Sequence, residues 1–272
     1  MTAGADYSRH VLGLWFDVCD PGGPRLGAID RLAQTAEGRK LARFAAMLMV
    51  ETGFKDESVH AASYSYKPID GSWESGEAEA FLKQKFGAGA ATYDEIKAQR
   101  LTAAQFTDFL FDSVPVEPHI TVLDVGCGTG LVGERLLGKV GVLDGIDLCE
   151  EMVAKARSKN VYDRLVVAEA AAGLAGCGTH DLILCNWCLL YMPRLDDFFA
   201  AAARALSPGG QLVLTVYACG DAWDALAMGE REFAHSRPYL RRLAKSNGLA
   251  EDRMEIRVLC ASPGYFCVFD NP

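Results

Sequence analysis

Residues 122–130, with the sequence VLDVGCGTG, constrain the fold of this 272-residue chain more than any other segment. The apolar run predicts a buried parallel strand. The alternating glycines predict a tight ligand-binding loop, because glycine adopts positive φ and lets a ligand approach the backbone closely. A helix expected over residues 131–137 points its unpaired N–H groups at that loop, which favours an anionic group such as a carboxylate. Leu131 stands where a dinucleotide-binding pattern requires glycine, so NAD and FAD are disfavoured.

A second strand is predicted over residues 141–147, and it ends in Asp147. In nucleotide-binding folds an acid after the second strand engages the ribose hydroxyls. A carboxylate at this position can contact two vicinal hydroxyls through its two oxygens. The order of strand, glycine loop, helix, strand and terminal acid therefore indicates half of a nucleoside-binding fold.

The C-terminal part of the chain continues this alternation. We predict strands over residues 164–168, 181–187 and 211–217, helices over 149–160, 196–206 and 237–247, and a closing hairpin of 253–259 with 265–269. Strands that alternate with helices imply an α/β fold with a parallel sheet, and ligands bind beyond the carboxyl ends of such strands.

The N-terminal third is predicted to be mostly helical. Apolar residues at helical spacing predict one or two amphipathic helices over residues 25–51 and another over 7–19. Residues 63–76 mix aromatics with turn formers and are predicted to form a loop, followed by a helix over about 75–86. Thr92 and Thr102 each begin a capping-box pattern, so we expect a helix to start at each.

Composition narrows the possible partners. A net charge of −9 argues against nucleic acid, because that affinity comes from clustered Lys and Arg. We see no secretory signal and no apolar segment long enough to span a membrane, so a soluble, cytoplasmic protein without a membrane partner is expected. Nine cysteines scattered along the chain fit a reducing compartment. Cys185 and Cys188 form a CxxC pattern, yet no second ligand pair is present, which favours packing over a metal or redox role.

The family resemblance becomes specific from about residue 93 onwards. The matching motifs are Asp124-x-Gly126-x-Gly128-Thr129-Gly130, then Asp147, Met152 and Ala156, then DLILCN at 181–186 and LSPGG at 206–210. On these residues the chain resembles the class I S-adenosylmethionine-dependent methyltransferases. The resemblance implies a Rossmann-like, seven-stranded, mostly parallel sheet with an antiparallel last strand. Residues 93–272 would form this domain, and residues 1–92 a helical cap or lid.

The resemblance also implies cofactor contacts at the glycine loop. Asp124 would help to hold the methionine amino group of S-adenosylmethionine, and Asp147 would hold the ribose. The alternatives are structural: Asp124 would tie the loop to neighbouring N–H groups, and Asp147 would cap the next helix. The implied loop contacts are Gly126, Cys127, Gly128 and Gly130.

Further contacts are implied beyond the later strands. Leu148 and Met152 would pack against adenine, although a methionine at helical spacing is also typical of a core. Glu169 would meet the adenine amino group, unless it is simply a solvated acid. Asn186 would face the methionine end.

Methyl transfer from a sulfonium needs mainly positioning, so a catalytic base is optional. If the acceptor is a hydroxyl, a histidine of near-neutral pKa is the usual base. His235 is the candidate, in a segment (FAHSRPYL, residues 233–240) that resembles the tails of bacterial methyltransferases related to predicted tetratricopeptide-associated ones. The alternative is a histidine that fixes a helix start beside Ser236. Tyr191, beyond the fourth strand, is the second candidate.

The expected function is methyl transfer from S-adenosylmethionine to a small-molecule O, N or C acceptor. Two alternatives stay open: a protein methyltransferase whose N-terminal helices recognise a partner, and a cofactor-binding scaffold or assembly factor without transfer activity. The sequence does not indicate the acceptor or the oligomeric state.

Overall fold

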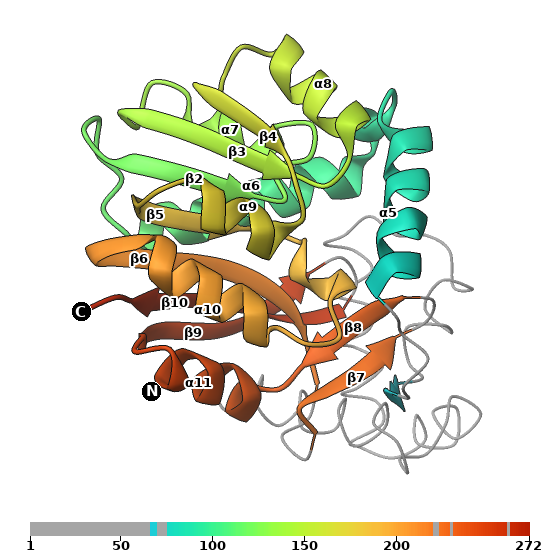
Figure 1. The fold of residues 1–272 in the computed structure, drawn as a ribbon, viewed down its shortest axis with the longest axis vertical. Coiled ribbons are helices and arrows are strands. Elements are labelled where there is room, and N and C mark those ends of the chain that lie inside the picture. The colour runs from blue at the N-terminus through green and yellow to red at the C-terminus, as the bar shows by residue number, and fades with distance from the viewer. Residues whose placement is uncertain (1–65, 70–74, 220–222, 229–230, 260–261) are drawn as a thin grey trace, which may run out of the picture.

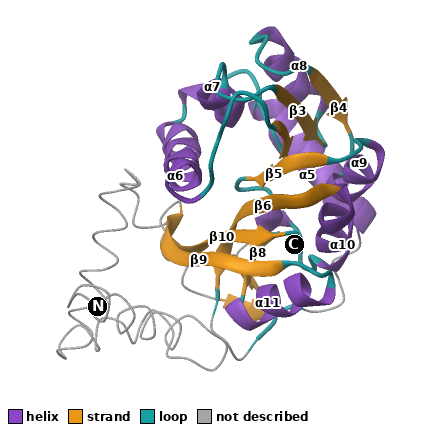
Figure 2. Cartoon of the chain, turned by 90° about the vertical axis from the view of Figure 1, so that its left-hand side faces the viewer, coloured by secondary structure: helices purple, strands orange, loops and turns teal. Residues whose placement is uncertain are grey.

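The computed structural model describes residues 66–69, 75–219, 223–228, 231–259 and 262–272. Within these residues ten strands form one sheet, and helices cover both of its faces (Figure 1 and Figure 2). The helices predicted over residues 7–19 and 25–51 lie outside the described residues. No helix in the described part of the chain is long and apolar enough to cross a lipid bilayer.

Seven of the strands form the central part of the sheet, in the spatial order β4, β3, β2, β5, β6, β10, β9. Their bounds are β2 Thr121–Val125, β3 Val142–Asp147, β4 Arg164–Val167, β5 His180–Cys185, β6 Leu206–Ala218, β9 Ala250–Leu259 and β10 Ser262–Asp270. Strands β2 to β6 pair in parallel, and β10 runs antiparallel to both β6 and β9. The predicted α/β fold with an antiparallel last strand is confirmed.

Three short strands extend this sheet beyond the seven that were expected. They are β1 Tyr66–Pro68, β7 Ala225–Met228 and β8 Glu232–His235. Strand β8 pairs in parallel with the last residues of β6, β7 pairs antiparallel with β8, and β1 pairs antiparallel with β7. The prediction of a loop over residues 63–76 was therefore wrong at β1. Strands of three or four residues carry too little alternation to be recognised in a sequence.

Helices form two layers around the sheet. Their bounds are α5 Ser75–Gly89, η2 Tyr93–Glu95, α6 Lys97–Ser113, α7 Leu131–Leu136, α8 Glu150–Ser158, α9 Ala170–Gly176, η3 Leu189–Tyr191, α10 Asp196–Ala205 and α11 Arg237–Ser246. Helices α6 and α7 cover one face, and α9, α10 and α11 cover the other (Figure 2). On the first face Phe106 and Phe109 pack with Phe266, and on the second Phe199 packs with Phe269. The strands are thus apolar on both faces, as expected for a parallel sheet covered by helices.

Of the two predicted helix starts, the one at Thr102 was wrong, and the one at Thr92 begins only a 3-10 helix of three residues. Thr102 lies inside α6, and its hydroxyl donates to the carbonyls of Ala98 and Gln99, because a threonine within a helix can bond back to the preceding turn. Thr92 precedes only the short η2 and makes no capping bond with its side chain. Helix α9 was not anticipated, since its sequence AAAGLAG lacks apolar periodicity.

Tyr162 fastens α7 to the sheet. An added Cβ at Gly133 of α7 would lie 2.6 Å from the Tyr162 hydroxyl, and one at Gly145 of β3 would lie 3.1 Å from the ring. The hydroxyl donates to Asp124 Oδ2 at 2.7 Å. Both glycines therefore provide the space that this partly buried tyrosine occupies between helix and strand.

Two glycine-to-alanine changes in helices should have opposite effects on stability. Gly176→Ala adds a methyl group with no atom within 4 Å and should stabilise by a few tenths to about 1 kcal/mol. Gly133→Ala displaces Tyr162 and should destabilise by roughly 1–3 kcal/mol, and by less in a Tyr162→Leu background. Urea unfolding measures both values. Equal changes in the free energy of unfolding at the two sites would show that Tyr162 can move aside.

Candidate active site

The carboxyl ends of β2, β3, β4 and β5 meet at one edge of the sheet. A cavity of about 980 Å³, its open mouth included, lies at this edge. Helix α5 runs across the strand ends (Figure 1), and its Leu82 and Phe86 line the cavity together with Tyr93 of η2. The site thus combines the predicted strand-end residues with residues from the predicted cap.

The glycine loop after β2 is fixed to the neighbouring strands. The N–H groups of Gly126 and Cys127 both donate to the Ile146 carbonyl, at 2.8 and 2.9 Å. Gly126 has a φ of 73°, and an added Cβ there would lie 2.7 Å from Cys188 Sγ. Gly126, Cys127 and Gly128 line the cavity, whereas Gly130 is not among the lining residues and serves as the N-cap position of α7. The loop is therefore shaped before any ligand binds. Contact of these glycine-loop residues with a cofactor stays a prediction.

Asp147 both braces the loop and faces the cavity. Its Oδ2 accepts the N–H of Gly128 at 2.8 Å, and its Oδ1 accepts the N–H of Cys149 at 2.9 Å. Burial raises the pKa of Asp147 above its ordinary value, and these two backbone donors partly offset that rise. Each carboxylate oxygen has a second lone-pair site, so a ribose contact and the capping alternative are compatible.

Asp124 lies beneath the loop rather than on the cavity wall. It is 1% exposed, and its partner is the Tyr162 hydroxyl. Burial raises its pKa to about 7, although the Tyr162 bond lowers it, and the nearby Asp147 adds to the rise. The hydrogen bond that the structure gives this carboxylate comes from a tyrosine, not from the neighbouring N–H groups of the predicted alternative. Contact of Asp124 with a methionine amino group stays a prediction.

Glu169 and the two apolar candidates, Leu148 and Met152, also line the cavity. Glu169 caps α9 by accepting the Ala172 N–H at 3.0 Å, and it also lines the cavity. Leu148 and Met152 line it as well, and Met152 Cε would lie 3.4 Å from a Cβ at Gly128. The residues predicted to contact the nucleoside therefore all line the same cavity.

Trp187 is a cavity residue that the sequence did not point to. It follows Asn186, the predicted residue at the end of β5, and both line the cavity. Its φ of 52° is a left-handed conformation that costs a bulky residue about 1–3 kcal/mol. The Thr215 hydroxyl stabilises it by accepting the Trp187 N–H at 2.9 Å and donating to Asn186 Oδ1 at 3.1 Å. Strain of this kind is concentrated at functional sites.

Gln99 was also missed. It lies on α6 with Thr102 and Ala103, and all three line the cavity at helical spacing. Its Oε1 is buried and has no hydrogen-bond partner within the described residues. A buried carbonyl oxygen of this kind costs free energy unless a donor reaches it, so it marks a place for a ligand N–H.

The two predicted catalytic residues have different positions. Tyr191 lines the cavity. His235 is not among the lining residues: it is fully buried, its Nε2 donates to the Met192 carbonyl at 3.0 Å, and its ring stacks on Tyr239. Burial lowers its pKa to about 4. Ser236 caps α11, so the geometry favours the alternative role beside a helix start. The base role stays a prediction.

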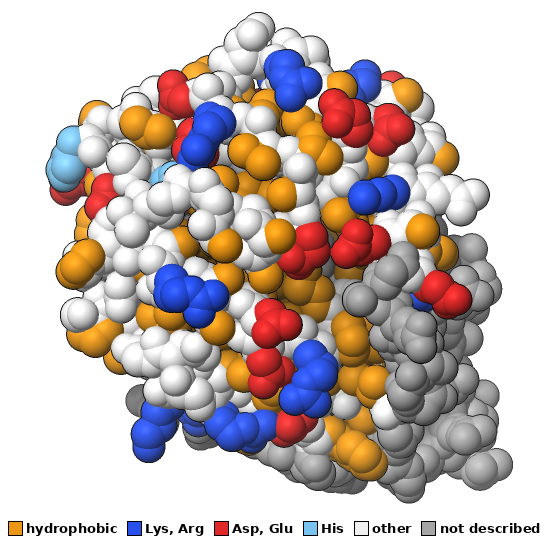
Figure 3. Space-filling view, in the orientation of Figure 1, with side chains coloured by type: hydrophobic (Ala, Val, Ile, Leu, Met, Phe, Trp, Pro, Cys, Tyr) orange, Lys and Arg blue, Asp and Glu red, His pale blue; other side chains and the backbone are white. Residues whose placement is uncertain are grey.

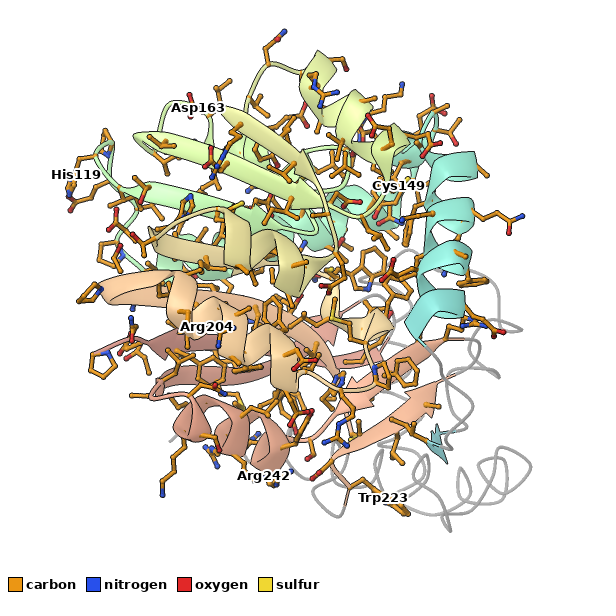
Figure 4. All side chains as sticks on the ribbon, viewed as in Figure 1. His119, Cys149, Asp163, Arg204, Trp223 and Arg242 are labelled. Atoms are coloured by element: carbon orange, nitrogen blue, oxygen red, sulfur yellow. The ribbon has the colours of Figure 1, made fainter. Side chains whose placement is uncertain are left out.

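The described cysteines are free thiols. Cys185 is buried in β5, and Cys188 packs on the glycine loop, as the packing interpretation predicted. Cys149, labelled in Figure 4, lies beside α5 and donates to Glu151 Oε2 at 3.0 Å. Within the described residues no group of His, Cys, Asp and Glu is placed to hold a metal ion.

A family model described as a methyltransferase domain matches residues 123–214. The ubiquinone biosynthesis O-methyltransferase of Thiobacillus denitrificans is 39% identical over 95 residues, which cover 33% of this chain and 40% of that protein. The malonyl-[acyl-carrier protein] O-methyltransferase of Enterobacter lignolyticus is 28% identical over 176 residues, covering 62% and 67%. The chain thus spans between two fifths and two thirds of the length of these relatives.

The fold is also similar to a solved structure. Magnesium protoporphyrin IX methyltransferase from Synechocystis PCC 6803, with bound S-adenosylmethionine, superimposes with a TM-score of 0.57 at 16% identity, covering 75% of this chain and 100% of that one. Fold and site define an α/β domain with a cavity at the carboxyl ends of its strands. The comparisons support a class I S-adenosylmethionine-dependent methyltransferase. The narrower tetratricopeptide-associated resemblance stays a prediction.

His235→Gln should flatten the pH dependence of stability, because glutamine can still donate to Met192 but does not titrate. The pKa of His235 falls from an ordinary 6.5 to about 4 on folding. Between these values the unfolded chain binds more protons, so wild-type stability falls as pH drops from 6.5 to 4. As pH falls through that range, the free energy of unfolding of the variant should rise relative to that of wild type by up to about 3 kcal/mol.

Urea unfolding at several pH values measures this difference. His119, which lies on an exposed loop (Figure 4), provides the control His119→Gln, which should change stability by less than about 0.5 kcal/mol. Parallel pH profiles for wild type and His235→Gln would contradict the neutral, buried state. The same variant also tests catalysis: a base would cost about 10²–10⁴ in turnover.

Proposed function

We propose that the cavity binds S-adenosylmethionine and that the chain transfers its methyl group to a small-molecule acceptor. The observation that carries this proposal is the grouping of the glycine loop, Asp147, Glu169 and Asn186 around one cavity at the carboxyl edge of the sheet. Both relatives described above are named O-methyltransferases, which supports methylation on oxygen.

The nucleoside end of the cavity fits this cofactor. Asp147 keeps acceptor capacity for ribose hydroxyls after bracing Gly128 and Cys149. Leu148 and Met152 provide an apolar wall for adenine, and Glu169 Oε1 remains for its amino group while Oε2 caps α9. These contacts need no rearrangement of the backbone.

The methionine end fits through the glycine loop and Gln99. The glycine positions leave the backbone open to close approach, since a Cβ at Gly128 would fill space next to Met152. The unpartnered Gln99 Oε1 would accept a hydrogen bond from the cofactor ammonium group. A charge-assisted bond of this kind is stronger than a neutral one.

The bound cofactor would supply a methyl group already activated on a positively charged sulfur. The residues of the chain then provide position and exclude water, and positioning alone contributes up to ~7–11 kcal/mol in favourable cases. Helix α5 contributes to this, since Leu82 and Phe86 close one side of the cavity. We therefore keep residues 1–92 as a proposed cap and 93–272 as the proposed catalytic domain.

The proposed function involves no nucleic-acid partner. On the face shown in Figure 3 basic and acidic side chains are interspersed, which supports the absence of a nucleic-acid surface there. A cytoplasmic location agrees with a small-molecule enzyme and stays a prediction from the sequence.

Asp147→Ala should weaken binding of S-adenosylhomocysteine by roughly 1.5–3 kcal/mol, or about tenfold to more than a hundredfold. The change removes both the ribose contact and the brace on Gly128. Calorimetric titration measures the affinity, and Asp252→Ala, at an exposed position remote from the cavity lining, is the control. Unchanged affinity in a folded variant, or binding of NADH by the wild type, would refute the proposed cofactor.

Gln99→Leu should weaken the same ligand by about 1–3 kcal/mol, because the ammonium group loses its acceptor. Gln105→Leu is a matched control: it lies on the same helix and also has a buried, unpartnered Oε1, yet it does not line the cavity. If both variants bind S-adenosylhomocysteine as tightly as wild type, Gln99 does not contact the cofactor. If both bind equally weakly, the effect comes from α6 packing.

A further inference from the structure

Asp94 joins parts of the structure that are far apart in the sequence. It lies in η2, before the residues 123–214 that match the methyltransferase family. One carboxylate oxygen, Oδ1, accepts the hydroxyl of Thr129 in the glycine loop. The other, Oδ2, lies 2.7 Å from Nζ of Lys159, which follows α8. Arg100 of α6 donates to the backbone carbonyl of Asp94, so the main chain of this residue is fixed as well.

The bond from Thr129 attaches the glycine loop to η2. Thr129 is 1% exposed, so its hydroxyl is removed from bulk water and needs a partner within the protein. That partner, Asp94, lies 35 positions earlier in the chain. A hydroxyl has a single O–H to donate, and a carboxylate is a stronger acceptor than a neutral oxygen. Because the preceding residue, Gly128, lines the cavity, this bond fixes the loop directly beside the site.

Lys159 places a cation on the same carboxylate. Its side chain is 16% exposed, and its Nζ lies 3.2 Å from Glu134 Oε2 of α7 in addition to the contact with Asp94. A partly buried pair is screened less by solvent than an exposed one. The Asp94 carboxylate is therefore held from two sides, by the glycine loop and by the end of α8.

Tyr93, the residue next to Asp94, forms part of the cavity wall. Its ring lines the cavity and meets Phe86 of α5 edge to face, with centroids 6.2 Å apart and an interplanar angle of 66°. Such an arrangement is a preferred geometry of aromatic pairs. Both rings pack against the buried Cys149 and Met152. The three residues of η2 thus supply a ring to the cavity wall and a carboxylate to the glycine loop.

Two parts of the cavity lining therefore depend on one side chain. A 3-10 helix of three residues has little stability of its own, because its hydrogen bonds have poor geometry and too few residues share them. The tertiary contacts of Asp94 supply what the short helix lacks. A displacement of Asp94 would move the Tyr93 ring and release the Thr129 hydroxyl together.

We propose that Asp94 is a positioning residue of the cofactor site, which holds the glycine loop through Thr129 and the Tyr93 ring through η2. This rests on the proposed function, since the ligand concerned is the one proposed for the cavity. Asp94 does not line the cavity, so it acts through its neighbours. A ligand that meets a loop already held in place loses less free energy in ordering it, so removal of Asp94 should lower affinity.

The first test is calorimetric titration of the full chain with S-adenosylhomocysteine. Asp94→Ala should weaken binding by about tenfold. Asp108→Ala is the matched control: Asp108 also pairs with a cation at 2.7 Å, Arg135, but it contacts neither the glycine loop nor the cavity. It should change the affinity by less than about threefold.

Wild-type affinity in Asp94→Ala would overturn the proposal, as would equal losses in Asp94→Ala and Asp108→Ala. Failure of the wild-type chain to bind S-adenosylhomocysteine would overturn the proposed function instead.

The second test separates positioning from a general loss of stability. Thr129→Val removes the hydroxyl and should weaken binding by about tenfold, whereas Thr129→Ser keeps it and should bind within about threefold of wild type. If Asp94 acts through Thr129, the double variant Asp94→Ala, Thr129→Val should bind no more than about threefold more weakly than Asp94→Ala alone. Independent effects would multiply to about a hundredfold.

A multiplied loss in the double variant would overturn the proposal. Equal affinities of Thr129→Val and Thr129→Ser would do so too, and this comparison decides the matter without Asp94→Ala if that variant does not fold. A role in stability alone would lower the free energy of unfolding of these variants without producing the shared loss of affinity or its recovery by serine.

Discussion

The attachment of the glycine loop to β3 is the constraint on which the site depends. Two consecutive N–H groups, those of Gly126 and Cys127, share the Ile146 carbonyl, and the next carboxylate, Asp147, accepts the N–H of Gly128. Cys188, after β5, packs against Gly126 from the other side. Three parallel strands thus fix a loop that would otherwise be the most mobile type of segment, since glycine has the largest conformational freedom.

Several groups serve the fold and the site together. Asp147 braces the loop, Glu169 caps α9, and Asn186 completes the Thr215 bonds that stabilise the strained Trp187. Because these side chains are already positioned by the backbone, binding does not have to order them, and less free energy is lost on association. The arrangement also means that a substitution at any of them affects stability as well as affinity.

The sequence predicted the parts of the molecule that are local. A strand, a glycine loop and a terminal acid are contiguous in the chain, so the central strands were predicted from residues 120–190. Eight of the residues implied as cofactor contacts, Gly126 and Asp147 among them, line the cavity, and their contact with a cofactor stays a prediction. What the sequence missed depends on tertiary placement. Gln99 and Trp187 line the cavity because α6 and the segment after β5 pack around it.

The predictions that differ from the structure also have physical causes. The Thr102 pattern resembles a helix start, yet α6 continues through it because the threonine hydroxyl finds acceptors in the preceding turn. His235 lies in a segment that suggested a pocket, whereas β8 carries it into the core, where burial keeps it neutral. A sequence motif identifies the histidine, but the position of its strand in the fold determines whether its side chain reaches a ligand.

The buried acids make the cavity favourable for a positively charged ligand. Burial raises the pKa of Asp124 to about 7 and that of Asp147 above its ordinary value, and the nearby Asp147 adds to the rise at Asp124. A cation in the cavity opposes the rise of both pKa values, so under the proposed function these acids favour the positively charged cofactor over its neutral-sulfur product. Loss of the charge on transfer would weaken that attraction. Discrimination between cofactor and product would then depend on the acids beneath and beside the glycine loop.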